Sequence, residues 1–212
     1  HLGFDTLINE PMTIAEIARV AYFSPAELPS DMDSAGLEVI GGYRPKQDSG
    51  AFAYSTHVAI VEIDRDFATV ELRDYVAVDD CGTQVNPMIV EGQILGGIVQ
   101  GIGTALFEEI KYDESGQPQA STFADYLVPG CGDIPNIRLF SIETPSPFTR
   151  FGLKGVGEGG AIAPPAAIVN AVNDALLPFG AEVSEVPVSP ARILDALEQA
   201  GIAPGIPERA AS

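Results

Sequence analysis

The sequence predicts a mixed fold (α/β, in the α+β arrangement) in which a β-hairpin region is followed by buried, glycine-rich helices. Three observations support this prediction. Residues 54–63 and 69–78 each show the apolar–polar alternation of a half-buried strand. A nearly uncharged, glycine-rich stretch follows Asn86 and Pro87. A further apolar stretch with the length of a helix follows the glycines of residues 152–160.

The N-terminal elements lead up to the hairpin. Thr13 and Glu16 have the spacing of a capping box, which predicts a helix that runs to about Tyr22. Residues 37–43 are interpreted as a strand. Only residues 64–66 separate the two alternating stretches, so these stretches are expected to pair as one long hairpin.

The helix after the hairpin has an unusual composition. Asn86 is a good N-cap and Pro87 suits the first helical position. The glycines of residues 94–103 each cost up to about 1 kcal/mol relative to alanine. Glu91 is the only charged residue between Pro87 and Phe107. We therefore expect this helix to be buried, with another group lying close to its backbone.

The C-terminal half contains two further helices. Residues 111–118 predict a hairpin turn, and residues 137–142 predict a strand. Pro164 and Pro165 are expected to open a helix over 166–177, and a last helix is expected from Ser189 to Ala200. We divide the chain into a β-rich N-terminal lobe (1–85) and a lobe with the glycine-rich segments and C-terminal helices (86–212).

The charge balance argues against two classes of partner. The chain has 11 Lys and Arg residues against 30 Asp and Glu residues, a formal net charge of −19. Nucleic acids and anionic membranes both bind clustered basic side chains, so neither is expected. No apolar run approaches the roughly 18 uninterrupted residues of a membrane span. Cys81 and Cys131 are interpreted as reduced thiols of a cytoplasmic protein.

Glu158 is the first candidate for chemistry. It is the only carboxylate in the glycine-rich loop Gly152–Gly160, where Val and Leu separate the glycines. A carboxylate in such a place could act as a general base. The alternative is a surface turn with a solvated glutamate. His57 is interpreted as a structural histidine of its strand, because a Ser-His-Asp triad or a histidine-based zinc site has little support with only two histidines.

Two other patterns admit both a functional and a structural interpretation. Gln93 and Gln100 are seven residues apart and share one face of a helix, where their amides could bind the edge of a heterocyclic ligand. Alternatively, they bond to neighbouring backbone. Residues 155–160 fit the dinucleotide pattern G-x-G-x-x-G, but the pattern is weak in a glycine-dense loop without a clear preceding strand.

Several ordered motifs resemble the molybdenum-binding large subunit of the xanthine dehydrogenase (molybdenum hydroxylase) family. They include DDCGTQVNP at 79–87, VEGQ at 90–93, KGVGE at 154–158 and PAAIVNAVNDA at 165–175. The matching stretch runs from about residue 37 to residue 197. It resembles only the C-terminal portion of the molybdenum-binding domain of that subunit.

The resemblance implies a role for each matching residue. Glu158 stands where the family has its catalytic glutamate beside molybdenum, the base in a hydroxylation whose oxygen comes from water. Gln93 stands where the family holds the pterin with a side-chain amide. The cofactor-binding residues that the resemblance implies are Gln93, Lys154, Gly155, Val156 and Gly157, and no residue is implied as a direct metal ligand.

The resemblance also implies partners. The cofactor would be molybdopterin with molybdenum, in bacterial members usually molybdopterin cytosine dinucleotide. The family's Gly-Gly-Phe-Gly and Arg-Gly cofactor segments are absent from this sequence. We therefore expect the rest of the large subunit on another chain and activity only in that complex. FAD and [2Fe-2S] clusters are expected on further chains, since two cysteines cannot supply the four ligands of a cluster.

Three hypotheses follow for function. The first is a molybdenum-dependent oxidoreductase subunit that hydroxylates a small N-heterocycle or aldehyde, with Glu158 as the base. The second is a non-catalytic assembly or binding module of the same fold, in which Glu158 is idle. The third is a nucleotide-binding module that uses the loop Gly152–Gly160.

Overall fold

The computed structural model describes residues 12–31, 37–38, 40–44, 51–64 and 66–202. The chain divides between Arg44 and Pro45 into two compact units. The first unit contains α1 (Ile14–Phe23), whose capping box between Thr13 and Glu16 is formed as predicted. The first unit also contains the 3₁₀ turn Pro25–Glu27, and the second unit holds the other helices and the sheet.

The predicted strand at residues 37–43 is wrong for the part of it that the structure describes. Residues 37–38 and 40–43 are not in a strand, and Val39 lies outside the described residues. A strand needs a hydrogen-bonded neighbour. The strands of the described part of the chain pair only with one another, as a three-stranded sheet.

The predicted hairpin is confirmed and forms most of that sheet. Strand β1 (Tyr54–Ile63) pairs antiparallel with β2 (Val70–Asp80), with Tyr54 opposite Asp80 at one end. Strand β3 (Ile137–Ser141) lies parallel to β2 on its other side, which gives the order β1-β2-β3. The carboxyl end of β2 therefore lies beside the start of β1 and the end of β3.

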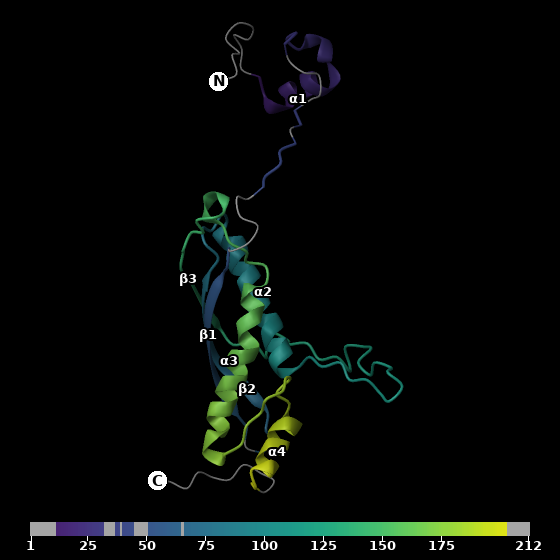
Figure 1. The fold of residues 1–212 in the computed structure, drawn as a ribbon. Helices are drawn as coiled ribbons and strands as arrows, with labels where there is room; N and C mark the ends of the chain where they lie inside the picture. Colours follow the sequence, from purple (N-terminus) through teal and green to yellow (C-terminus); the bar gives the residue numbers. More distant parts are fainter. Residues whose placement is uncertain (1–11, 32–36, 39, 45–50, 65, 203–212) are drawn as a thin grey trace. The chain divides into compact units, whose positions relative to one another are not determined.

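Two long helices pack side by side on one face of the sheet (Figure 1). Helix α2 (Pro87–Leu106) begins at its predicted N-cap, Asn86. Helix α3 (Gly159–Leu176) packs against both α2 and β1. By length and composition alone, α2 and Gly159–Phe179 could cross a membrane. In the structure, some of their apolar side chains form one core with the sheet; its fully buried members include Tyr75, Ile94, Ile98, Ile102, Ile168, Val172 and Leu176.

The expectation that a group lies close to the backbone of the glycine-rich helix is confirmed, and that group is α3. A Cβ atom added at Gly97 would lie 3.0 Å from the Cα of Gly160. A Cβ atom added at Gly160 would overlap the carbonyl oxygen of Ile94. The glycines of the two helices thus allow their backbones to approach each other.

Helix α3 begins earlier than predicted. Pro164 and Pro165 are its sixth and seventh residues, not its opening residues. A proline inside a helix removes a backbone hydrogen bond. Here that loss is offset by tertiary packing. Pro164 is buried, and its ring packs directly against Gly101 of α2: a Cβ atom added at Gly101 would lie only 2.8 Å from that ring. Local sequence rules do not include this contact, so they placed the start too late.

The predicted lobe boundary between residues 85 and 86 falls inside the second unit. Tyr75 of β2 and the isoleucines of α2 belong to the same hydrophobic core, so the strands and helices do not separate there. The observed division lies between residues 44 and 45.

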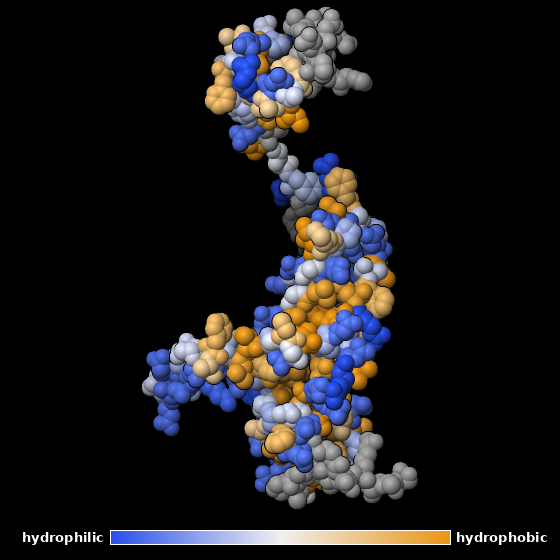
Figure 2. Space-filling model, turned by 180° about the vertical axis from the view of Figure 1, so that it is seen from behind, coloured by the Kyte–Doolittle hydropathy of each residue, from blue (hydrophilic) through white to orange (hydrophobic). Residues whose placement is uncertain are grey.

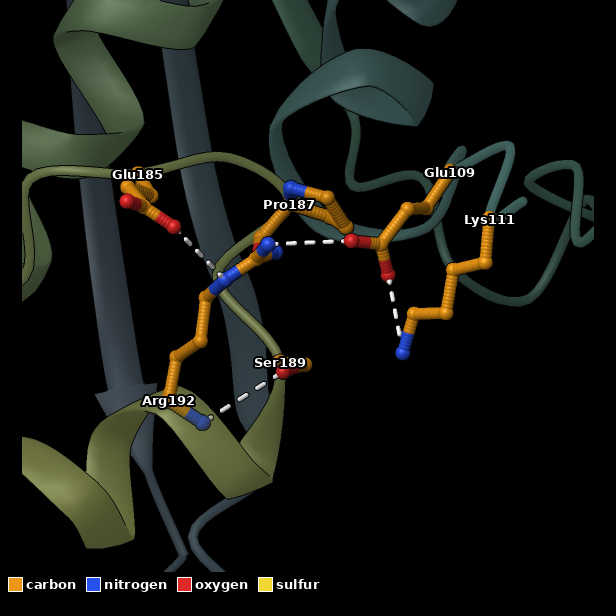
Figure 3. A network of polar contacts seen from close by, with 6 residues as sticks. All are labelled: Glu109, Lys111, Glu185, Pro187, Ser189 and Arg192. Carbon is orange, nitrogen blue, oxygen red and sulfur yellow. Dashed lines mark hydrogen bonds and ion pairs between the residues drawn. The ribbon is translucent and has the colours of Figure 1, made fainter. Parts of the chain in front are cut away.

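The C-terminal helix α4 (Pro190–Gln199) forms as predicted and is held to the chain after α2 by a polar network (Figure 3). The guanidinium of Arg192 donates to the carbonyl of Pro187 at 2.7 Å and to Glu109 at 2.9 Å. Glu109 also pairs with Lys111 at 3.3 Å. This network lies near Val70, at the other end of β2 from Asp80.

Candidate cofactor site

The glycine-rich loop is attached to the residues that follow β2. Gly82 and Leu153 form an antiparallel bridge. The backbone N–H of Lys154 donates to the carbonyl of Cys81 at 2.9 Å. These bonds place residues 153–158 beside the carboxyl end of β2, and α3 starts directly after them.

Gln93 and Gly157, two of the predicted cofactor-binding residues, are in direct contact. The side-chain amide of Gln93 donates to the carbonyl of Gly157 at 2.7 Å. The second glutamine of the helix does not reach the loop. Gln100 donates to the carboxylate of Glu108 at 3.0 Å, and the hydroxyl of Tyr126 bonds to the same carboxylate. The idea that both amides serve one ligand is therefore not supported for Gln100.

The surface beside this contact is open. Among the described residues, no atom of another part of the chain lies within 4 Å of a Cβ added at Gly155 or Gly157, and the same holds for Gly92 and Gly96 of α2. Val156, between the two loop glycines, packs against the hydrophobic core. The side chain of Val156 thus anchors this part of the loop, and the glycines on either side of Val156 expose their backbone.

Glu158 is the N-cap residue of α3, and its side chain makes no capping hydrogen bond. The residue is exposed. In this chain the exposure corresponds to the alternative left open by the sequence, a solvated glutamate in a surface turn, because the neighbouring glycines have no side chains with which to cover it. Its carboxylate is free to accept a proton from a group that approaches the open surface.

Lys154 points away from that surface. Its ammonium pairs with the carboxylate of Asp80 at 3.2 Å and lies 4.5 Å from the ring centroid of Tyr54. Only 5% of the Lys154 side chain and 2% of the Asp80 side chain are exposed. Burial acts to raise the pKa of Asp80, but hydrogen bonds from Thr144, Gly82 and Lys154 outweigh it and lower that pKa to about 2.

A second buried polar group lies on the helix-covered side of the sheet. The Nδ1 atom of His57 is 2.8 Å from the hydroxyl of Tyr75, and its Nε2 atom is 3.7 Å from Oδ2 of Asp79. Burial, together with the charge of Asp79, raises the pKa of Tyr75. His57 is thus a buried strand histidine, as predicted. Within the part of the chain that the structure describes, Nε2 of His57 and Oδ2 of Asp79 have no hydrogen-bond partner.

Sequence reasoning gave Asp79 and Asp80 no role of their own. The signal that could have indicated a role was the pair of consecutive carboxylates at the end of an apolar strand. Carboxylates that are buried at such a place need hydrogen-bonding or charged partners. The partners come from β1 and from the loop, which lie 20 or more residues away in sequence. Cys81 and Cys131 are free thiols, as predicted.

The chain matches the family model of the molybdopterin cofactor-binding domain over residues 4–135. It is 40% identical over 197 residues to the nicotine 6-hydroxylase large subunit of Paenarthrobacter nicotinovorans, covering 92% of this chain and 24% of that protein. It is 34% identical over 190 residues to the carbon monoxide dehydrogenase large chain of Afipia carboxidovorans, covering 90% and 23%.

Solved structures agree with these relatives. Quinoline 2-oxidoreductase from Pseudomonas putida 86 has a TM-score of 0.74 and 45% identity, covering 89% of this chain and 24% of that one. The chain thus spans about a quarter of the length of the relatives it matches. On the family model and these relatives, the chain belongs to the molybdopterin cofactor-binding domain family of the molybdenum hydroxylases.

Proposed function

We propose that this chain forms part of the molybdopterin site of a molybdenum hydroxylase and that Glu158 is its catalytic base. The observation that carries the proposal is the hydrogen bond from Gln93 to Gly157. It joins the two segments implied to hold the cofactor, directly beside Glu158. The open glycine surface around this bond leaves room for a large planar ligand.

The residues at this surface suit molybdopterin. A pterin is flat and has hydrogen-bonding edges, which backbone groups and amides can match. Gly155 and Gly157 would bring bare backbone to the cofactor, and Gln93 retains an amide oxygen as an acceptor. When bound, the molybdenum cofactor supplies the redox chemistry. The form that bacterial members use, molybdopterin cytosine dinucleotide, is the form that we propose here.

Glu158 has the chemistry of a base at this surface. Its carboxylate makes no capping bond and stands at the start of α3. It would accept a proton from the oxygen that is transferred to the substrate. A positioned general base typically contributes 10²- to 10⁴-fold to a rate.

The substrate that we propose is a small N-heterocycle or aldehyde. Two relatives are named for N-heterocycles, nicotine 6-hydroxylase and quinoline 2-oxidoreductase, and they are 40% and 45% identical to this chain. This likeness favours the heterocycle over the aldehyde. It also supports an oxidoreductase that works as a subunit of a larger complex, since the relatives are named as large subunits or chains. A cytoplasmic location is part of the proposal.

We propose that the remaining part of the large subunit covers the exposed apolar face of the sheet. Figure 2 shows hydrophobic side chains gathered on the face that α2 and α3 leave uncovered. Val58, Ile60, Phe140 and Ile142 are each more than half exposed there. Large exposed apolar patches mark interaction sites. FAD and [2Fe-2S] clusters are proposed to lie on further chains.

Metal and pterin analysis of the purified complex tests this function. Molybdenum and pterin in equal amounts, close to one per copy of this chain, are expected. A complex without molybdenum would refute the proposal. Nucleotide binding by the isolated chain would instead favour the nucleotide-binding module. Full turnover of a Glu158→Gln complex would favour the non-catalytic module.

A further inference from the structure

We propose that Asp79 and Asp80, the last two residues of β2, are positioning residues that fix the two ends of the loop carrying Glu158. This inference rests on the proposed function of Glu158. Successive side chains of a strand point to opposite faces of the sheet. The two carboxylates can therefore hold different parts of the loop from one point in the backbone.

Asp80 holds the beginning of the loop. Its Oδ1 atom accepts hydrogen bonds from the backbone of Gly82 at 2.8 Å, from the backbone of Thr144 at 3.2 Å and from the Lys154 ammonium at 3.2 Å. Buried charges need such partners. Because Lys154 is committed to this pair, its role is to fix the loop rather than to contact the cofactor.

Asp79 lies beneath the end of the loop. Its Oδ1 atom is 3.8 Å from the position of a Cβ on Gly159, the first residue of α3 and the neighbour of Glu158. A carboxylate is favourable at the N-terminus of a helix of this length. On its other side, Oδ2 is 3.7 Å from Nε2 of the fully buried His57. Among the described residues, neither of these two atoms has a hydrogen-bond partner.

The loop needs such anchors because of its composition. Gly155 and Gly157 permit many backbone conformations and have open space around them. A loop paired with Asp80 through Lys154, with Asp79 close to Gly159 at its other end, would restrict Glu158 to a small region. Small displacements of a catalytic group can cost 10²-fold in rate. The two carboxylates would thus set the geometry of the base without touching substrate.

The test uses Asp79→Asn and the double variant Asp80→Asn with Lys154→Met, each in the assembled enzyme. The double variant removes both buried charges, so it avoids the unpaired lysine that Asp80→Asn alone would leave. Asp195→Asn is the matched control, because Asp195 is exposed on α4, which lies near the other end of β2 from the loop. Amide hydrogen exchange of residues 153–161 and steady-state turnover are measured.

We expect faster exchange in residues 153–161 and at least a tenfold lower kcat, with a smaller change in KM, in both loop variants and not in Asp195→Asn. Thermal melts verify that each variant is folded. Unchanged exchange and unchanged kcat in folded loop variants would overturn the inference. Glu158→Gln is measured in the same series. If the loop variants are unchanged but Glu158→Gln is inactive, the inference about Asp79 and Asp80 fails and the proposed function stands. If Glu158→Gln is fully active, the proposed function fails instead.

Discussion

Gln93 joins helix α2 to the loop that carries Glu158, through the bond to Gly157. Replacing Gln93 with leucine removes this bond and the amide implied to hold the pterin. We predict a complex with less than half of the wild-type pterin and molybdenum content. A single lost hydrogen bond costs only about 1 kcal/mol of stability, so the fold should persist.

Gln100→Leu provides the control for that variant. It removes an amide from the same helix, but one bonded to Glu108. Its pterin content should equal that of the wild type. Equal losses in the two variants would show that the effect of Gln93→Leu comes from general damage to α2.

Asp80 is expected to make the free energy of unfolding depend on pH in the acid range. Its folded-state pKa is lowered to about 2, below the ordinary value of about 3.9. A lowered pKa stabilises the fold at pH values above the ordinary pKa, and this contribution is lost as the pH falls toward 2. We predict that the free energy of unfolding falls more steeply between about pH 4 and pH 2 in the wild type than in the double variant Asp80→Asn with Lys154→Met, which leaves no unpaired buried lysine. Parallel curves from urea titrations would contradict this.

At the scale of elements, the contact between α2 and α3 depends on glycine. A Cβ on Gly160 would overlap the carbonyl oxygen of Ile94. We predict that Gly160→Ala lowers the free energy of unfolding by about 1–3 kcal/mol, the usual cost of overpacking. Gly96→Ala is the control, because an added Cβ meets nothing within 4 Å and alanine favours the helix by up to about 1 kcal/mol. Equal stability of the two variants in urea would contradict the packing argument.

Local signals predicted those elements whose ends are set by nearby residues. The capping box at Thr13, the hairpin and the start of α2 at Asn86 were predicted because neighbouring atoms supply the hydrogen bonds. The start of α3 was wrong because the compensation for Pro164 comes from α2, far away in sequence. The strand at 37–43 failed because its residues found no partner among the described strands.

The candidate site was also predictable only in part, because some of its contacts join residues that are far apart in sequence. The resemblance placed Glu158 and Gln93, and the structure adds the contact from Gln93 to the loop. The pairing of Lys154 with Asp80 joins positions 74 residues apart, so no local pattern indicates it. The sequence left open whether Glu158 is shielded or solvated, because glycine-rich sequence is equally compatible with a filled pocket and with an open surface; the structure shows an exposed residue.

At the scale of the whole molecule, the open sheet face is proposed to be an interface. Ile60 is 53% exposed on it. We predict that Ile60→Glu abolishes co-purification with the rest of the large subunit but changes the melting temperature of this chain little. Leu177→Glu is the control, since Leu177 is 71% exposed on a 3₁₀ turn after α3 rather than on the sheet. Retained co-purification of Ile60→Glu would place the interface elsewhere.

The charge pattern agrees with this view of the molecule. The net charge of −19 is spread over the hairpin, the loops and the ends of the chain. Between Pro87 and Phe107 the only charged residue is Glu91, and the segment 152–171 contains only Lys154 and Glu158. In the structure these two segments meet through Gln93 and Gly157. The nearly uncharged parts of the sequence are thus the parts proposed to meet the cofactor.

The most direct test of the central claim is the rate of substrate hydroxylation by Glu158→Gln, normalised to bound molybdenum. The variant keeps the size of the side chain but removes its ability to accept a proton. We predict a normal molybdenum content and a rate at least 10²-fold below that of the wild type. Glu198→Gln, an exposed site on α4, should retain the wild-type rate. A wild-type rate in Glu158→Gln at full molybdenum content would contradict the account.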